Sequence, residues 1–85
     1  MYRIRLSNYA EKELDKFNQV LYDRIYQKIK SLENNPRPFG VIKLSDEESY
    51  RVRVGSYRIL YDINDKENTI DIYEVVHRKD AYRKK

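Results

Sequence analysis

The chain has 85 residues, of which 38% are charged and 40% hydrophobic, and its formal net charge is +4. This length suits one small domain, so we expect a single unit over residues 1–85. The charge content is too high for a membrane protein, and no apolar run approaches the roughly 20 residues of a membrane span. The aliphatic and tyrosine content is too high for a disordered chain. The composition therefore predicts one folded domain without a membrane span.

The sequence contains no cysteine and one histidine, His77. The lack of cysteine excludes disulfides, thiolate catalysis and cysteine-ligated zinc, and one histidine leaves little for a multi-histidine metal site. Residues 1–6 have no signal-peptide hydrophobic segment. We therefore expect a cytoplasmic protein that uses neither a metal nor another cofactor.

The N-terminal part of the chain changes from a strand pattern to a helix pattern. Residues 2–6 alternate between apolar and basic side chains, which predicts a half-buried strand. Ser7 is a suitable N-cap, and apolar residues follow at helical spacing, so we expect a helix over about 8–16. The apolar stripe of this helix consists of Ala10, Leu14 and Phe17.

A second helix is predicted to begin after Asn18, another capping residue. Its apolar stripe recurs every three or four residues, as in an amphipathic helix. The stripe consists of Leu21, Ile25, Ile29 and Leu32. We expect this helix to end near residue 34, because Pro36 disfavours a helical conformation at the residue before it. The two helices should form a hairpin whose apolar seam covers a sheet.

The rest of the chain shows strand patterns separated by turns. A loop over 36–40 precedes a short strand pattern at 41–44, and longer ones follow at 50–54, 57–63 and 69–76. The main elements have the order β-α-α-β-β-β. We predict an α+β fold, an antiparallel-rich sheet joined by the N-terminal strand with both helices on one face. The polar and basic tail at about 78–85 fits a short helical turn, and its last three residues, Arg83, Lys84 and Lys85, also fit a frayed solubilising end.

Only the dipeptide Gly55-Ser56 separates two of these strand patterns. Glycine at the first position of a two-residue loop suits a type II′ turn, which sets the pairing so that Arg53 faces Arg58. One face of the hairpin then carries apolar and tyrosine side chains that belong to the core. The other face carries three arginines. This arginine face consists of Arg51, Arg53 and Arg58.

Like charges opposite one another across strands oppose folding by some tenths of a kcal/mol to about 1 kcal/mol. Such an arrangement is tolerated where an anion binds, and the planar guanidinium matches a phosphate bidentately. The arginine face therefore predicts a phosphate-binding surface. The alternative is a solvated sheet face balanced by nearby carboxylates, for which the candidates are Glu47, Asp62 and Asp71.

The end of the last strand carries a second group of polar side chains, His77, Arg78 and Tyr82. Arginine can stabilise the charge on a phosphate during transfer, and histidine or tyrosine can move protons. A lone histidine at a strand end also fits a surface or capping role. These residue types are suitable for phosphodiester chemistry beside the arginine face.

Glu74 interrupts the apolar alternation of the last strand. Strict alternation from Ile70 and Ile72 would place Glu74 on the core face. Either a β-bulge near Tyr73 or a buried basic partner is therefore required. Both solutions are open at this point.

Two segments resemble the RelE/ParE toxins of type II toxin–antitoxin pairs. One is the arginine hairpin at 50–61, and the other is the segment 76–82, which ends in a His-Arg-x-x-x-Tyr pattern. The length and the element order also match, so the resemblance covers nearly the whole chain. It implies a RelE-like fold. For RelE-type members it implies an mRNA endoribonuclease that works in the ribosomal A site and inhibits translation. In that reaction the ribose 2′-hydroxyl attacks the adjacent phosphate and the 5′-oxygen leaves.

The resemblance also implies functional residues, position by position. The implied catalytic set is Arg51, Arg53, Arg58, Arg78 and Tyr82. The implied secondary or RNA-binding set is Lys43, His77, Arg83 and Lys84. Because arginine hardly loses its proton, it is unsuited to the role of general base. Tyr82 and His77 are the two candidates for accepting the 2′-proton.

The resemblance leaves three functions open. One is the nuclease, whose partners are the ribosome and mRNA. The second is a ParE-like protein that inhibits DNA gyrase without cutting nucleic acid. The third is an inactive relative that binds an antitoxin. All three imply a small antitoxin that covers apolar grooves and neutralises the basic face, and none implies a membrane or a small-molecule cofactor.

Overall fold

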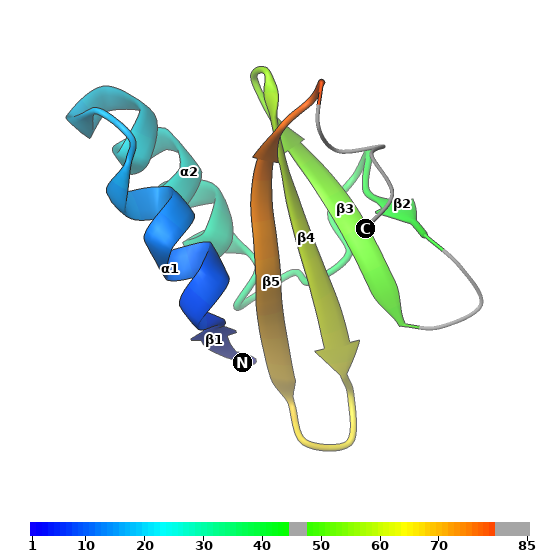
Figure 1. Ribbon diagram of the computed structural model, residues 1–85. Coiled ribbons are helices and arrows are strands. Elements are labelled where there is room, and N and C mark those ends of the chain that lie inside the picture. The colour runs from blue at the N-terminus through cyan, green and yellow to red at the C-terminus, as the bar shows by residue number, and fades with distance from the viewer. Residues whose placement is uncertain (45–47, 80–85) are drawn as a thin grey trace.

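The computed structural model describes residues 1–44 and 48–79 (Figure 1). The helices are α1 (Asn8–Asp15) and α2 (Gln19–Ser31). The strands are β1 (Arg3–Leu6), β2 (Ile42–Lys43), β3 (Ser49–Val54), β4 (Tyr57–Asn64) and β5 (Thr69–His77). The predicted α+β fold and element order are confirmed, and the short strand pattern at 41–44 forms β2. Neither helix is long and apolar enough to cross a membrane, as far as the described residues go.

Both helices begin at the predicted caps. Ser7 Oγ accepts a hydrogen bond from the Ala10 N–H at 3.0 Å, and Asn18 Oδ1 accepts one from the Leu21 N–H at 2.9 Å. The second helix ends at Ser31, before the predicted boundary. Its last turn tightens, because Leu32 donates its N–H to the Ile29 carbonyl, three residues back.

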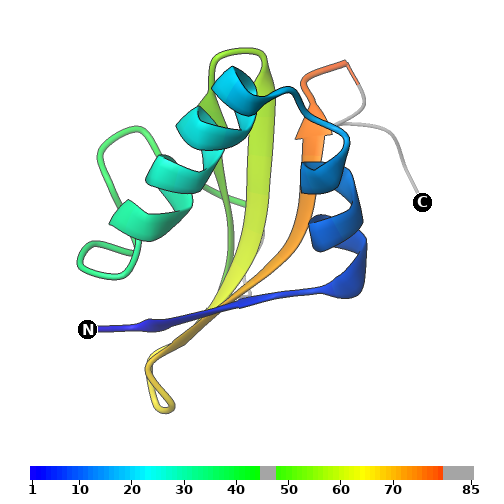
Figure 2. The ribbon, with the colours of Figure 1, turned by 90° about the vertical axis from the view of Figure 1, so that its left-hand side faces the viewer.

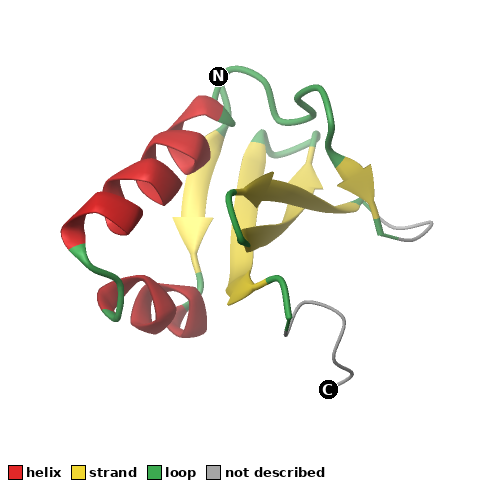
Figure 3. Ribbon diagram, turned by 90° about the horizontal axis from the view of Figure 1, so that it is seen from above, coloured by secondary structure: helices red, strands yellow, loops and turns green. Residues whose placement is uncertain are grey.

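The sheet has the strand order β1-β5-β4-β3-β2. Strand β1 pairs with β5 in parallel, and the other neighbours are antiparallel. Both helices lie on one face of this sheet (Figures 2 and 3). The turns β3–β4 and β4–β5 lie at opposite ends of the sheet (Figure 1). The other face of the central strands is not covered by a helix and carries the arginine face.

The core fills the space between the helices and the sheet. Its fully buried members come from both layers, since each layer must cover the apolar face of the other. They include Ile25 of α2, Leu32 directly after α2, and Ile59, Tyr61, Ile70, Ile72 and Val75 of the sheet. Val76, Arg58 and Leu60 are buried on the outer face, apart from this cluster.

A β-bulge in β5 resolves the position of Glu74. The pairing shifts between Leu60, which faces Glu74, and Tyr61, which faces Ile72, so Tyr73 is the extra residue. Glu74 therefore shares the outer face with Leu60, while Ile72 stays in the core. Of the two solutions that the sequence left open, the bulge is the correct one.

Candidate nucleic-acid interface

The β3–β4 hairpin has the predicted register, with Arg53 opposite Arg58 and Arg51 opposite Leu60. Gly55 has a φ of +58°, whereas Ser56 does not have a positive φ. This combination fits a type II′ turn, which needs a positive φ only at its first central residue. The arginine face is therefore present as predicted, on the outer side of the sheet.

Arg58 is the buried member of this face. Arg58 is only 8% exposed, and its Nη1 has no hydrogen-bond partner among the described residues. A buried N–H without an acceptor is unfavourable, and more so on a charged group. The fold thus holds a guanidinium in place with unused hydrogen-bonding capacity.

Two apolar side chains flank Arg58 on the outer face, which it shares with Arg53 and Glu74. Leu60 and Val76, both 8% exposed, lie beside it on β4 and opposite it on β5. An apolar surrounding lowers the local dielectric constant and strengthens the attraction of a cation for an anion. Arg51 is half-buried and Arg53 is exposed. The three arginines therefore offer one buried and two more accessible cations to an anionic ligand.

The far end of the same face is acidic. Asp62 pairs with Asp71, and Asp71 accepts two hydrogen bonds from Arg5, at 2.6 and 3.0 Å. The Asp71 carboxylate raises the pKa of Arg5. Asp62 is four positions from Arg58, about 13 Å along the strand. These two carboxylates therefore do not neutralise Arg58, and Glu47, the third candidate for that role, lies outside the described residues.

Arg78 follows the end of β5 and lies beside the hairpin turn. Its backbone N–H donates to the Ser56 carbonyl at 2.6 Å, which fixes the exit of β5 at the end that carries Arg58. The Arg78 side chain is exposed. The other predicted residues of the C-terminal segment, Tyr82, Arg83 and Lys84, lie outside the described residues, as does most of the predicted tail.

Lys43 and His77 lie on the opposite side of the sheet. Lys43 pairs with Tyr50, whose ring is part of the core, and its Nζ is 3.5 Å from a Glu48 carboxylate oxygen. His77 pairs with Tyr57, and the two rings meet edge to face at 5.2 Å. Cross-strand partners share a face, so neither residue joins the arginine face.

His77 makes a hydrogen bond that bears on its chemistry. Its Nδ1 accepts the Lys79 backbone N–H at 3.2 Å. A neutral imidazole that accepts at Nδ1 carries its proton on Nε2, and then has no free lone pair. This arrangement disfavours His77 as the acceptor of the 2′-proton.

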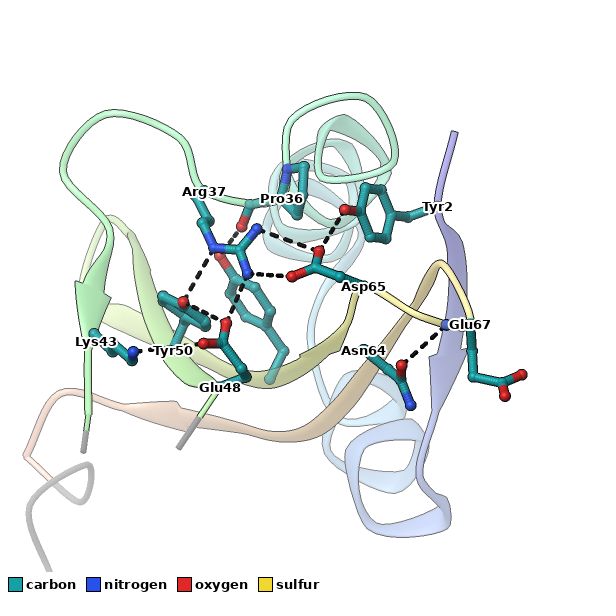
Figure 4. A network of polar contacts seen from close by, with 10 residues as sticks. Tyr2, Pro36, Arg37, Lys43, Glu48, Tyr50, Asn64, Asp65 and Glu67 are labelled. Atoms are coloured by element: carbon teal, nitrogen blue, oxygen red, sulfur yellow. Dashed lines mark hydrogen bonds and ion pairs between the residues drawn. The ribbon is translucent and has the colours of Figure 1, made fainter. Parts of the chain in front are cut away.

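Sequence reasoning missed a polar network behind the hairpin, centred on Arg37 (Figure 4). The Arg37 guanidinium bonds to Glu48 at 2.6 Å, to Asp65 at 3.0 Å and to the Tyr50 hydroxyl at 3.0 Å. The Tyr2 hydroxyl donates to Asp65 at 2.6 Å. The only sequence signal was an arginine between two prolines, which stiffen the loop that carries it.

This network shifts the pKa values of its members. Hydrogen bonds from Tyr50 and then Arg37 lower the pKa of Glu48. Hydrogen bonds from Arg37 and then Tyr2 lower the pKa of Asp65. Burial raises the pKa of the nearby Tyr61, whose hydroxyl donates to the Pro36 carbonyl at 2.7 Å. The network therefore favours ionised carboxylates and supports the hairpin from the side opposite the arginine face.

The family comparison matches nearly the whole chain. The family model described as the ParE toxin of the type II toxin–antitoxin system parDE covers residues 4–82. The chain belongs to the RelE/ParE superfamily of type II toxins. The toxin has no match among curated protein sequences.

Solved structures give the same family and fold. The toxin is 27% identical to a chain of the archaeal RelE–RelB complex from Pyrococcus horikoshii, with a TM-score of 0.81 over 94% of this chain and 98% of that chain. It is 28% identical to a chain of the Mycobacterium tuberculosis RelBE2 complex, with a TM-score of 0.78 over 91% and 98%. The intact Escherichia coli RelBE complex, at 19% identity, a TM-score of 0.81 and coverage of 91% and 96%, shares the fold.

Proposed function

We propose that this toxin is a ribosome-dependent mRNA endoribonuclease that cuts in the A site without a metal. The observation that carries the proposal is Arg58, a buried guanidinium with an unpaired Nη1 on a face with two further arginines. The similarity to chains of RelE–RelB complexes at 26% to 28% identity supports RelE-type chemistry. The RNA phosphate is the anion that this face would receive.

The proposed reaction uses the cations as a charge-stabilising surface. The ribose 2′-oxygen attacks the adjacent phosphorus, the P–O5′ bond breaks, and a 2′,3′-cyclic phosphate remains. Arg58 would bind a non-bridging oxygen and stabilise the charge that builds up in the transition state. Arg51, Arg53 and Arg78 would hold the strand on either side.

Proton transfer is assigned to Tyr82, which would take the 2′-proton while a proton reaches O5′ from solvent or a neighbouring cation. His77 is the weaker candidate, since its Nδ1 is already occupied by the Lys79 N–H. A tyrosine, with an ordinary pKa near 10, works as a base only where nearby cations favour its anion. The proposal therefore requires Tyr82 to act beside the arginine face.

We further propose a small antitoxin as the partner, located with the toxin in the cytoplasm. The related archaeal protein comes from a RelE–RelB complex and the related mycobacterial protein from a toxin–antitoxin complex. An acidic segment of the antitoxin would be complementary to the arginine face and would block phosphate binding there.

A second candidate is a ParE-like inhibitor of DNA gyrase. The description of the matching family model, a ParE toxin, favours it. Gyrase binding needs no reactive phosphate site, so it does not require Arg58 to act on a transition state. The two functions therefore differ in their dependence on Arg58.

The deciding experiment is primer extension on an mRNA paused on purified ribosomes. We expect wild-type protein and an Arg3→Ala control, an exposed β1 position, to cut within the A-site codon. Arg58→Met should abolish cutting while circular dichroism shows an intact fold, and Arg78→Ala and Tyr82→Phe should weaken it. If wild-type protein makes no cuts but inhibits supercoiling by gyrase, the gyrase function replaces the nuclease.

A further inference from the structure

A second group of cations lies in a shallow groove between α2 and the end of the β3–β4 hairpin. We call it the α2 groove. Its lining comes from the two elements together: Arg24, Gln27, Lys28 and Ser31 of α2, and Arg53, Val54 and Gly55 of the hairpin. These residues include three cations and no carboxylate. The groove is thus a positively charged surface outside the catalytic residues proposed above, with Arg53 as the shared member.

The fold creates the groove because one edge of β3 is incompletely covered. Strand β2 pairs with Arg51 and Tyr50, so among residues 1–44 and 48–79 no strand lies beside the last residues of β3 on that side. The α2 residues of the groove are spaced by three or four positions and therefore lie on one face of the helix. That face and the open end of β3 form the two walls.

The cations of the groove lack counter-charges within the part of the chain that the structure describes. Arg24, Lys28 and Arg53 form no ion pair there. By contrast, Lys30 of the same helix is 3.5 Å from a Glu33 carboxylate oxygen. Like charges four residues apart on a helix, such as Arg24 and Lys28, oppose helix formation slightly. Uncompensated cations in a shared groove therefore indicate an anionic ligand.

Gly55 brings the Arg24 guanidinium close to the hairpin. A Cβ at Gly55 would lie 3.4 Å from Arg24 Nη2, an ordinary van der Waals distance, so the guanidinium lies directly beside the turn. Arg53, next to this turn, pairs with Arg58 on the outer face and also lines the groove. The cations thus continue from the arginine face around the end of the hairpin to α2.

We infer that the α2 groove binds backbone phosphates of the same RNA strand whose scissile phosphate lies at Arg58. This inference rests on the proposed function for the identity of the strand. Arg24, Lys28 and Arg53 supply the charge, and the Gln27 amide is a donor that suits phosphate oxygens. The Ser31 hydroxyl donates to the Lys28 carbonyl at 2.6 Å, so towards a ligand it can act only as an acceptor. The groove holds and orients the strand and takes no part in the bond cleavage.

The test measures RNA binding separately from cleavage. The probe is a short single-stranded 2′-O-methyl oligoribonucleotide, which lacks the attacking hydroxyl, followed by fluorescence anisotropy at several salt concentrations. The variant is Arg24→Gln with Lys28→Gln. The charge-matched control is Lys12→Gln with Lys66→Gln, two exposed lysines on α1 and in the β4–β5 turn.

We expect the groove variant to bind the probe about tenfold more weakly. The slope of log affinity against log salt should become shallower by about 1.4, because two phosphate contacts are lost and each contact to a single strand contributes about 0.7. The control should keep the wild-type slope. Equal slopes and affinities for the two variants, or no binding of the probe by wild-type protein, would overturn the inference.

Two further probes separate other ligands. A DNA strand of the same sequence and a polyglutamate peptide are titrated in the same way. If the groove variant loses affinity only for DNA, or only for the peptide, the groove does not serve RNA and the inference is wrong. If wild-type protein binds the probe through the groove but never cuts ribosomal mRNA, the proposed nuclease function alone is wrong. If wild-type protein cuts ribosomal mRNA but the groove variant binds the probe as tightly as the control does, this inference alone is wrong.

Discussion

Arg58 is a buried residue whose Nη1 has no acceptor among the described residues, flanked by Leu60 and Val76. In a monomer at rest this arrangement is unfavourable, because a charged N–H has lost water without gaining a partner. The same arrangement makes the guanidinium a strong binder of an anion. Stability and function therefore make opposite demands on this single position.

The conflict predicts the effect of Arg58→Met. Methionine fills a similar volume without a charge, so we expect the free energy of unfolding to stay unchanged or to rise by about 1 kcal/mol. Urea denaturation of both proteins measures this. The proposed A-site cleavage of mRNA, which depends on phosphate binding at Arg58, should be lost in the same variant. A loss of more than about 2 kcal/mol would mean that Arg58 has a structural partner and would remove the main argument for the phosphate site.

His77 gives a second prediction for a single residue. Because its Nδ1 accepts from Lys79 and its ring packs on Tyr57, it is expected to position the end of β5. His77→Gln should therefore change the rate of A-site cleavage by no more than about threefold, and leave the shape of its pH profile unchanged, whereas loss of a general base costs about a hundredfold or more. Single-turnover cleavage across the pH range measures both. A hundredfold loss with a missing acid limb would make His77 the base.

The β3–β4 hairpin is the element on which the candidate site depends. Its turn sets which residues pair, and the pairing sets which side chains share the outer face. The bulge at Tyr73 has a similar effect on β5, since it moves Glu74 to the outer face and keeps Ile72 inside. A one-residue slip in either strand would bury charges and expose the core.

The turn itself predicts the cost of changing Gly55. Gly55→Ala should destabilise the protein by about 1–2 kcal/mol, because a side chain is strained at a φ of +58°. The new Cβ would lie 3.4 Å from Arg24 Nη2, an ordinary van der Waals contact, so the expected cost comes from the backbone conformation and not from a clash. Urea denaturation measures this cost. Ser56→Ala is the control and should be nearly neutral, because Ser56 accepts the Arg78 N–H through its backbone carbonyl, which the substitution leaves in place.

At the scale of the whole molecule, the Arg37 network joins segments that are distant in sequence. Through it the loop after α2 is linked to Glu48 before β3, to Asp65 in the β4–β5 turn and, through that carboxylate, to Tyr2 near the N-terminus. The charged members Arg37, Glu48 and Asp65 are exposed, so each ion pair contributes little alone. Together they hold the loop over the core side of the hairpin.

The network predicts the acid stability of the fold. The pKa values of Glu48 and Asp65 are lower in the folded protein than in the unfolded chain. The stabilisation is therefore present above about pH 5 and is lost as the pH falls through the folded pKa values. Thermal melting at neutral pH and near pH 3 should show a smaller acid-induced drop for Arg37→Gln than for wild type. A Lys66→Gln control should behave as wild type, and equal drops in all three proteins would contradict the assignment.

Local patterns in the sequence determined the elements and one register. Period-two and helical spacing identified the strands and helices, and both caps were read from Ser7 and Asn18 because capping is a contact within a few residues. The Gly55-Ser56 turn specified the pairing of β3 with β4, and with it the arginine face, because a two-residue loop allows one register.

Only the tertiary structure decided which of these residues meet. The burial of Arg58 depends on Leu60 and Val76, and the latter comes from β5. The placement of Lys43 and His77 on the core side follows from registers of longer-range pairings, and the α2 groove from the packing of α2 beside an open strand edge. These features arise from contacts between segments far apart in the chain, whose energies do not appear in any local pattern of side chains.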